Sequence, residues 1–215
     1  MNLRFCLPRV AGRGAGLGNE LIAWARAYVA STVLDAQLLP PAFGLNPRRY
    51  GRHFGTPRYD WVAQRALQAC LPVVTFDERS FLDHGGESLA SAIRSHGAQL
   101  GLDRRGRFLW TTEGMWGGYR HILEARDFVR RTLQGSRYAE RNRATLRSRL
   151  DPAKILVGMH IRLGDFGAPA AVGDYRGRAN LSLPREWYLR IGARIRSHFG
   201  DAFARRADAR QVRRC

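Results

Sequence analysis

The chain begins with the order of elements that opens an α/β domain. Residues 3–7 have the apolar composition of a short β-strand, and glycines at positions 12, 14, 16 and 18 form a loop after it. Asn19 is a suitable N-cap for the helix that follows, in which apolar side chains recur on one face up to residue 33. A second short strand at residues 38–39 ends at Pro40. A strand, a helix and a second strand in this order predict an α/β fold.

The same alternation continues along the rest of the chain. Residues 155–161 form the clearest predicted strand, because their nearly continuous apolar run suits a parallel strand that is buried on both faces. Residues 119–150 contain no proline and predict two helices that separate near Gly135. The remaining strands are expected at residues 72–76 and 108–111, and the remaining helices at 61–70, 88–96 and 184–199.

The sequence predicts two domains followed by a tail. The break at Asp151-Pro152 ends the helical stretch and marks the predicted boundary. An N-terminal α/β domain is expected over residues 1–151, and a second domain begins within residues 152–200. Residues 201–215 are rich in arginine and lack apolar periodicity, so we expect a basic tail that is not native domain structure.

Positive charge dominates the composition. The chain carries 36 Lys and Arg against 18 Asp and Glu, which gives a net charge of +18. Lys154 is the only lysine, so almost all of these cations are arginine, whose forked guanidinium suits bidentate contact with phosphate. A coding bias towards arginine and alanine explains the excess equally well. Because Lys154 belongs to no G-x-x-x-x-G-K-[ST] motif, a P-loop nucleotidase is excluded.

No sequence feature predicts a disulfide scaffold, a metal site or an exported protein. Cys6, Cys70 and Cys215 form no C-x-x-C pair and are odd in number, which indicates a reducing compartment. The six histidines lack metal-ligand spacing. The N-terminus lacks a signal-peptide pattern, and the longest apolar region, residues 21–39, contains charged residues. We therefore expect a cytoplasmic protein, with peripheral contact to the inner face of the membrane as an alternative that its charge allows.

The glycine cluster at residues 12–19 is the first candidate binding element. Glycine between a strand and a helix lets the phosphate or sugar of a ligand approach the backbone N–H groups at the helix start. The spacing is not G-x-G-x-x-G, and no acidic residue ends the second strand to hold a ribose, so a dinucleotide site is disfavoured. A flexible turn without a ligand explains the cluster equally well.

Residues 157–166, at the end of the clearest predicted strand, are the second candidate. The carboxyl ends of strands are where α/β sheets bind their ligands. Arg162 can offer a forked donor to a diphosphate, and His160 and Asp165 can orient that fork or hydrogen-bond a sugar. A core histidine beside a surface Arg–Asp pair is the competing interpretation.

Taken together, the two motifs resemble those of the fucosyltransferases. Residues 16–20, Gly-Leu-Gly-Asn-Glu, resemble the G-x-[LF]-G-N-[QE] loop of that superfamily. Residues 157–165, Val-Gly-Met-His-Ile-Arg-Leu-Gly-Asp, are similar to its H-x-R-x-x-D signature. The α-1,2-fucosyltransferases of glycosyltransferase family 11 are the most similar group. The order and separation of the motifs fit, and the resemblance spans about residues 3–199.

The resemblance implies a fold and a reaction. It implies two Rossmann-like domains of the GT-B type facing a cleft, with the acceptor side and the glycine loop on the N-terminal domain and the nucleotide sugar bound by the second. It also implies GDP-fucose as donor, no cofactor, no required metal, and inversion at the anomeric carbon. Arg162 and Asp165 would be catalytic, with Arg162 pairing with the diphosphate and stabilising the leaving GDP. The donor-binding residues would be Gly16, Gly18, Asn19, His160 and Arg162.

The resemblance leaves the general base and the acceptor open. The acceptor hydroxyl must lose its proton, and Asp165, Asp174 and Glu20 are the candidates for accepting it. The acceptor would be a glycan, either galactose-ended or lipid-linked, and no nucleic-acid partner is expected.

Two departures from the family pattern suggest alternative functions. Leu163 stands where the signature commonly has a second arginine, which removes one phosphate contact. The second domain of the family continues for several more strands, so we expect a C-terminally truncated chain. The first alternative is therefore an inactive or non-catalytic fragment of such an enzyme. The second, which the charge allows, is a basic nucleic-acid-binding protein, although no zinc-finger, RNP or basic-zipper pattern is present.

Overall fold

The structure is a computed structural model of the 215-residue chain. The chain divides into two compact units, Met1–Asn142 (unit 1) and Arg143–Cys215 (unit 2). This division falls within the helix Ala139–Arg149, ahead of the boundary predicted at residue 151. The structure describes residues 3–9, 16–41, 50–54, 60–86, 88–114, 116, 118–151, 155, 157–159, 161 and 182–200.

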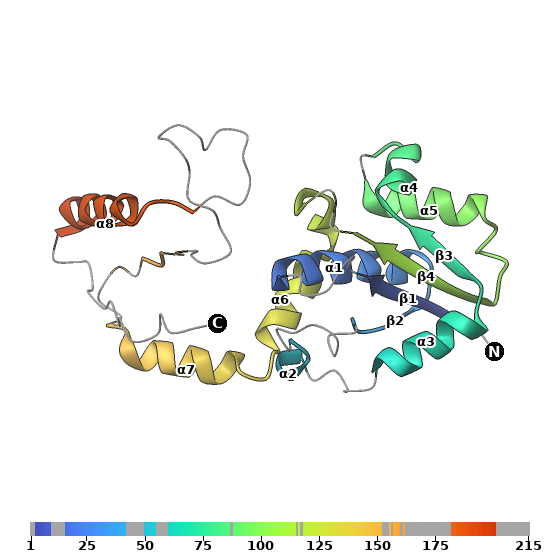
Figure 1. The fold of residues 1–215 in the computed structure, drawn as a ribbon, viewed down its shortest axis with the longest axis horizontal. Helices are drawn as coiled ribbons and strands as arrows, with labels where there is room; N and C mark the ends of the chain where they lie inside the picture. The colour runs from blue at the N-terminus through green and yellow to red at the C-terminus, as the bar shows by residue number, and fades with distance from the viewer. Residues whose placement is uncertain are drawn as a thin grey trace. The chain divides into compact units, whose positions relative to one another are not determined.

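Unit 1 contains a parallel sheet of four strands in the order β2-β1-β4-β3 (Figure 1). Its register places Cys6 of β1 and Val74 of β3 on either side of Trp110 of β4. The α/β fold expected from the sequence is therefore confirmed here. The strands are β1 (Leu3–Arg9), β2 (Gln37–Leu38), β3 (Val73–Phe76) and β4 (Arg107–Glu113).

Helices cover both faces of this sheet. Helices α1 (Leu17–Val33) and α5 (Leu89–Gln99) pack against each other on one face, and α3 (Asp60–Cys70) lies on the other (Figure 1). The strand order explains this division. The β1–β2 and β3–β4 connections run in one direction across the sheet, and the β2–β3 connection runs in the other. Because parallel crossovers are right-handed, connections that run in opposite directions place their helices on opposite faces of the sheet. The other described helices are α2 (Gly51–Phe54), α4 (Glu78–Asp83), the 3₁₀ helix η2 (Arg120–Ala125), α6 (Arg126–Gln134), α7 (Ala139–Arg149) and α8 (Arg185–Phe199).

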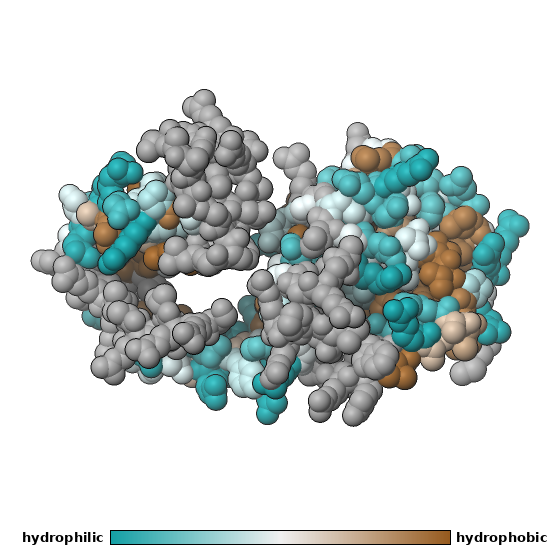
Figure 2. Space-filling model, in the orientation of Figure 1, coloured by the Kyte–Doolittle hydropathy of each residue, from teal (hydrophilic) through white to brown (hydrophobic). Residues whose placement is uncertain are grey.

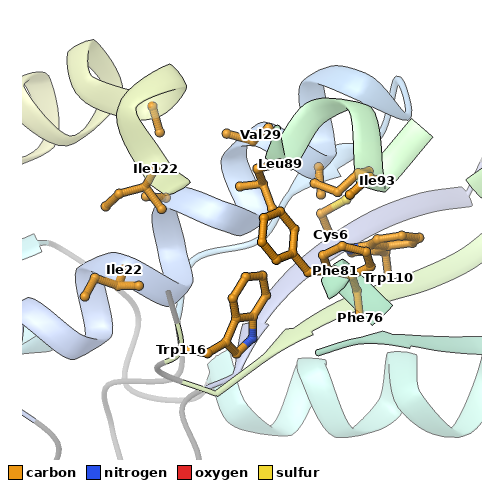
Figure 3. Packing of buried hydrophobic residues seen from close by; sticks show 14 of the residues in the cluster. Cys6, Ile22, Val29, Phe76, Phe81, Leu89, Ile93, Trp110, Trp116 and Ile122 are labelled. Carbon is orange, nitrogen blue, oxygen red and sulfur yellow. The ribbon is translucent and has the colours of Figure 1, made fainter. Parts of the chain in front are cut away.

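Alternate residues of β4 contribute to two separate cores. Phe108 and Trp110 pack in the larger cluster, on the face that α1 and α5 cover. Leu109, between them in the sequence, packs with Leu7 of β1 and Leu67 of α3 on the opposite face. The two-residue period of a strand therefore supplies both layers. Figure 3 shows the larger cluster, in which the labelled side chains include Cys6, Phe76, Leu89, Ile93 and Trp110.

Helix α1 begins three residues before the predicted position. Asn19 was predicted as the N-cap, but Gly16 occupies that position, with φ −65° and ψ 155°. The carbonyl of Gly16 accepts hydrogen bonds from the N–H groups of Asn19 (3.0 Å) and Glu20 (3.2 Å), so Asn19 lies within the first turn. Glycine is an acceptable N-cap, which is why the apolar pattern alone placed the helix start too late.

Helices α2 and α4 were not predicted. They are 4 and 6 residues long, too short for apolar periodicity to be visible. A local signal does exist for α4, because the Asp77 carboxylate accepts a hydrogen bond from the Ser80 N–H at 2.9 Å and caps the helix. This hydrogen bond lowers the pKa of Asp77 below its ordinary value.

The strand predicted at residues 155–161 is wrong for the residues that the structure describes there. Ile155 forms only an isolated β-bridge, and residues 157–159 and 161 have no regular structure. The side chains of Ile155, Met159 and Ile161 are 41%, 39% and 49% exposed. A buried parallel strand needs neighbours to pair its backbone groups. The described part of unit 2 contains no strand, and its regular structure consists of helix.

The edge strand β3 exposes part of its apolar surface. Figure 2 shows an apolar patch over β3, and Val73 of this strand is 44% exposed. Among the described helices, none is long and apolar enough to cross a membrane.

Candidate functional site

Strands β1, β3 and β4 end at one edge of the sheet, the carboxyl edge, where α/β folds bind their ligands. Arg9, the last residue of β1, lies beside Glu113, the last residue of β4, and the two side chains form an ion pair of 2.6 Å. Asp77 and Glu78 follow β3 directly. This edge therefore gathers acidic side chains from two neighbouring strand ends.

The predicted glycine element contacts the chain that follows β4. A Cβ atom added to Gly18 would lie 3.2 Å from the hydroxyl oxygen of Tyr119, so glycine at this position makes room for the phenol. Tyr119 is 70% exposed. Gly16, Gly18 and Asn19 are half-buried, and Gly16 offers no side-chain cap to the first N–H groups of α1. The structure thus brings Tyr119 to a motif one hundred residues earlier in the chain.

A groove of about 560 Å³ opens at the carboxyl edge, beside the ends of β3 and β4. Among the described residues, four carboxylates and one arginine line it, together with apolar surface. Asp83 pairs with Arg79 at 3.8 Å, and Glu113 pairs with Arg9. We call this feature the β3–β4 groove; its lining residues are Asp77, Glu78, Arg79, Leu82, Asp83, Glu113, Gly114 and Trp116.

Trp116 is a packing residue in the wall of the groove. Gly114 adopts φ +87°, a conformation that favours glycine, and the chain turns there so that Trp116 folds back towards β4. The indole N–H of Trp116 donates to the carbonyl of Glu113 at 2.8 Å, and its ring stacks on Phe81 with centroids 5.0 Å apart (Figure 3). These contacts fix the loop after β4.

Arg26 is a fully buried cation immediately behind this wall. Its guanidinium lies 3.7 Å from the centre of the Trp116 ring, and Nη1 donates to the Gly114 carbonyl at 3.3 Å. Among the described residues, Nε and Nη2 have no hydrogen-bond acceptor. Burial lowers the pKa of Arg26 to about 10, an effect that the nearby Glu78 carboxylate opposes. Arg26 therefore remains charged at neutral pH while two of its nitrogen atoms, Nε and Nη2, have no acceptor among the described residues.

Replacing Arg26 with methionine is expected to raise the free energy of unfolding by about 1–2 kcal/mol. Each buried N–H without an acceptor costs about 1–3 kcal/mol. The variant loses the contact with Trp116, worth about 2 kcal/mol when desolvated, and one hydrogen bond. Urea unfolding measures the difference, with the exposed Arg94→Met on α5 as the matched control. A loss of stability larger than that of the control would contradict this prediction.

His84 and His96 form a second polar cluster, between the end of α4 and α5. His84 Nε2 and His96 Nδ1 are 3.0 Å apart, a distance at which one ring donates to the other. His96 also makes edge contacts with the rings of Phe76 and Trp110. Burial and the neighbouring His84 lower the pKa of His96, while Asp77 and Asp83 oppose the shift.

Acidification is therefore expected to destabilise unit 1 through His96. Its pKa in the folded chain lies below the ordinary 6.5, so the unfolded chain binds the proton more readily. The stabilisation is complete above 6.5 and is lost as the pH falls from 6.5 through the lowered pKa. Thermal unfolding across this range should show a smaller decrease in Tm for His96→Gln than for the parent chain. The exposed His198→Gln should behave like the parent, and equal slopes for all three chains would refute the assignment.

The structure places only part of the predicted site. Gly16, Gly18 and Asn19 lie at the start of α1, and Glu20, one of the three candidate bases, lies in its first turn. His160, Arg162, Asp165 and Asp174 lie outside the described residues. The structure therefore brings the glycine motif together with Tyr119 and leaves the second motif as a prediction.

Sequence reasoning missed Arg26 and Glu78 as parts of this edge, and it missed the histidine pair between α4 and α5. A signal existed for Arg26, because it is the lone charged residue in the apolar run of residues 21–30. Glu78 could have been found from its position directly after a predicted strand. His84 and His96 are 12 residues apart and meet only because α4 and α5 are packed together, so no local pattern joins them.

Comparisons of the chain with protein-family models, with curated proteins and with solved structures give no match. Within the part of the chain that the structure describes, no three His, Cys, Asp or Glu side chains gather where a metal ion could lie. The fold and the site thus define a parallel α/β protein with an acidic groove at the carboxyl edge of its sheet.

Proposed function

We propose that the chain is an inverting fucosyltransferase of the α-1,2 type, which transfers fucose from GDP-fucose to a hydroxyl group of a glycan. The main support is the pair of sequence motifs, one of which, residues 16–20, opens α1 in a parallel α/β sheet. Helix starts in such sheets are suited to phosphates and sugars. The contact between Gly18 and Tyr119 adds an exposed phenol hydroxyl that can bind a sugar or a phosphate.

In the proposed reaction, the acceptor oxygen attacks the anomeric carbon of fucose from the side opposite the nucleotide. The bond from that carbon to the β-phosphate oxygen breaks, and GDP leaves with the electron pair. Arg162 pairs with the diphosphate and stabilises the charge that develops on it, while His160 and Asp165 hold the donor. The hydroxyl proton passes to a carboxylate, for which Asp165, Asp174 and Glu20 remain the candidates.

The finer fold that accompanies this proposal is the GT-B type, with two Rossmann-like domains. Unit 1 has the parallel sheet that such a domain requires. Residues 152–200 would begin the second domain and carry the H-x-R-x-x-D signature.

A nucleotide-sugar titration tests the proposed function directly. The purified full chain is titrated with GDP-fucose, with GDP-mannose and ADP-glucose as controls for the sugar and the base. Selective binding of GDP-fucose is the expected result. Equal affinity for ADP-glucose would exclude a GDP-specific donor site, and an absence of binding by a demonstrably folded chain would favour the non-catalytic fragment.

Nucleic-acid binding is the second candidate function, and one observation favours it. Helix α7 exposes Arg141, Arg147 and Arg149 on a chain whose net charge is +18. Binding through these groups would release counterions, so duplex affinity should fall steeply with salt. Tight, salt-sensitive duplex binding without any response to GDP-fucose would favour this function over the transferase.

A further inference from the structure

Strand β3 forms one edge of the sheet and lacks the features that usually protect an edge. In the described structure, β4 is its only strand neighbour. Edge strands are usually very short or carry charged side chains, because an unpaired backbone can pair with another chain. The other edge strand, β2, has only two residues. By contrast, β3 contains four uncharged residues that all favour strands: Val73, Val74, Thr75 and Phe76.

The backbone groups of β3 that face away from β4 are those of Val73 and Thr75. Leu109 of β4 donates its N–H to the carbonyl of Pro72 at 2.9 Å, so Pro72 faces β4. Successive residues of a strand turn their N–H and C=O groups to opposite sides. Val74 therefore faces β4 as well, and Val73 and Thr75 face the outer edge. Both of these side chains are exposed. The edge thus offers two donors and two acceptors beside an exposed apolar side chain.

A second copy of this edge, related by a two-fold axis through Val74, satisfies all of these groups. In an antiparallel pair, opposite residues whose backbone groups face each other exchange two hydrogen bonds. Val73 would lie opposite Thr75 of the second copy, and Thr75 opposite its Val73, so every donor meets an acceptor. Opposite residues share a face of the sheet, so each valine would pack against a threonine. Such an interface closes with two copies, because both use the same surface.

The charges at the two ends of β3 favour the same arrangement. Asp77 directly follows the carboxyl end of β3. At the amino end, the register of Val73 with Leu109 places Arg107, the first residue of β4, beside Leu71. In the antiparallel pair, Asp77 comes opposite Leu71 of the second copy and so lies close to that copy's Arg107. Asp77 and Arg107 are both exposed. An edge with the reverse order of charges complements this one, and the same edge turned around has that order.

We propose that the outer edge of β3 pairs with the same edge of a second copy, so that two copies of unit 1 share one continuous sheet. This inference is independent of the proposed function. The interface would bury Val73, which is 44% exposed, and the apolar patch over β3 (Figure 2). The net charge of +18 opposes association at longer range, so we expect a weak dimer in the micromolar range.

Sedimentation equilibrium of the full chain tests this proposal, under reducing conditions that prevent a disulfide through the exposed Cys70. As the concentration rises, the average mass should approach twice that of the chain. Val73→Lys should raise the dissociation constant of the dimer at least about tenfold, because a lysine on the edge must lose water when the edges pair. Leu133→Lys on α6 is the matched control, since Leu133 is 41% exposed and the variant adds the same charge. It should dimerise like the parent chain.

A charge reversal separates local pairing from net charge. Arg107→Glu and the control Arg126→Glu, at an exposed position of α6, each replace a cation with an anion. This change should relieve the repulsion between two positive chains. Arg107→Glu should nevertheless weaken the dimer about tenfold at low ionic strength, for charges about 10 Å apart in water, because it faces Asp77 of the second copy. Arg126→Glu should leave the dimer unchanged or strengthen it.

Amide hydrogen exchange locates the interface. Protection of the Val73 and Thr75 N–H groups should increase with protein concentration, whereas that of Leu109, which is already paired with Pro72, should change little. The proposal is overturned if the chain stays monomeric up to about 1 mM, if a dimer forms without this protection, or if Val73→Lys dimerises like the parent chain. A dimer that Arg107→Glu strengthens as much as Arg126→Glu does would also overturn it.

Discussion

Replacing Trp110 with alanine is expected to lower the free energy of unfolding by about 3–5 kcal/mol. The Trp110 side chain is completely buried at the centre of the larger core cluster. It stacks on Phe76 with ring centroids 5.1 Å apart and contacts the edge of His96. The variant loses this burial and leaves a cavity between the sheet and α5, which neighbouring side chains fill only in part.

Thermal and urea unfolding of the full chain measure this loss. For a chain of this length, about 1 kcal/mol corresponds to a change in Tm of about 2–4 °C. Val62→Ala is the control, because Val62 is 48% exposed on α3 and its truncation should cost well under half as much. Similar losses for the two variants would mean that Trp110 is not at the centre of the core.

The strands of unit 1 were predictable because each is marked by local composition. Apolar and β-branched residues at 3–7, 72–76 and 108–111 indicated β1, β3 and β4 without reference to the rest of the chain. The order β2-β1-β4-β3 was not predictable in the same way, because it depends on which crossovers pack on which face. The start of α1 was placed too late, because Gly16 has no side chain that could mark it as the N-cap.

The strand expected at residues 155–161 shows the limit of composition. An apolar run indicates that a segment can be buried, but a buried parallel strand also needs neighbouring strands on both sides. In the described part of unit 2 such neighbours are lacking, and Ile155 and Ile161 are partly exposed. A buried parallel strand and a partly exposed segment without neighbouring strands can have the same apolar run, so the sequence pattern cannot distinguish the two structures.

The candidate site was also predictable from the sequence only in part. Gly16 and Gly18 were predictable because a glycine cluster between a strand and a helix is a local signal. The β3–β4 groove combines residues from 77–83 with residues from 113–116, and Arg26 reaches it from a third segment. Only tertiary packing joins these segments, so sequence reasoning could indicate each strand end without showing that they form one groove.

Arg162→Ala is expected to weaken GDP-fucose binding by at least about 100-fold, because two charge-assisted hydrogen bonds worth about 1.5–3 kcal/mol each would be lost. Bidentate pairing with the diphosphate also needs the planar fork, so Arg162→Lys, which keeps the charge, should recover only part of the affinity. Isothermal titration with GDP-fucose measures all three chains.

The control for this prediction is Arg190→Ala, an exposed arginine of α8 that removes the same charge from unit 2. If binding depends on the net positive charge alone, Arg162→Ala and Arg190→Ala weaken it equally, and both losses shrink as salt is added. If Arg162 forms the specific diphosphate contact, its variant alone loses binding, and the loss persists at high salt. An unchanged affinity for Arg162→Ala would remove the main chemical role that the H-x-R-x-x-D signature assigns, and the fucosyltransferase proposal with it.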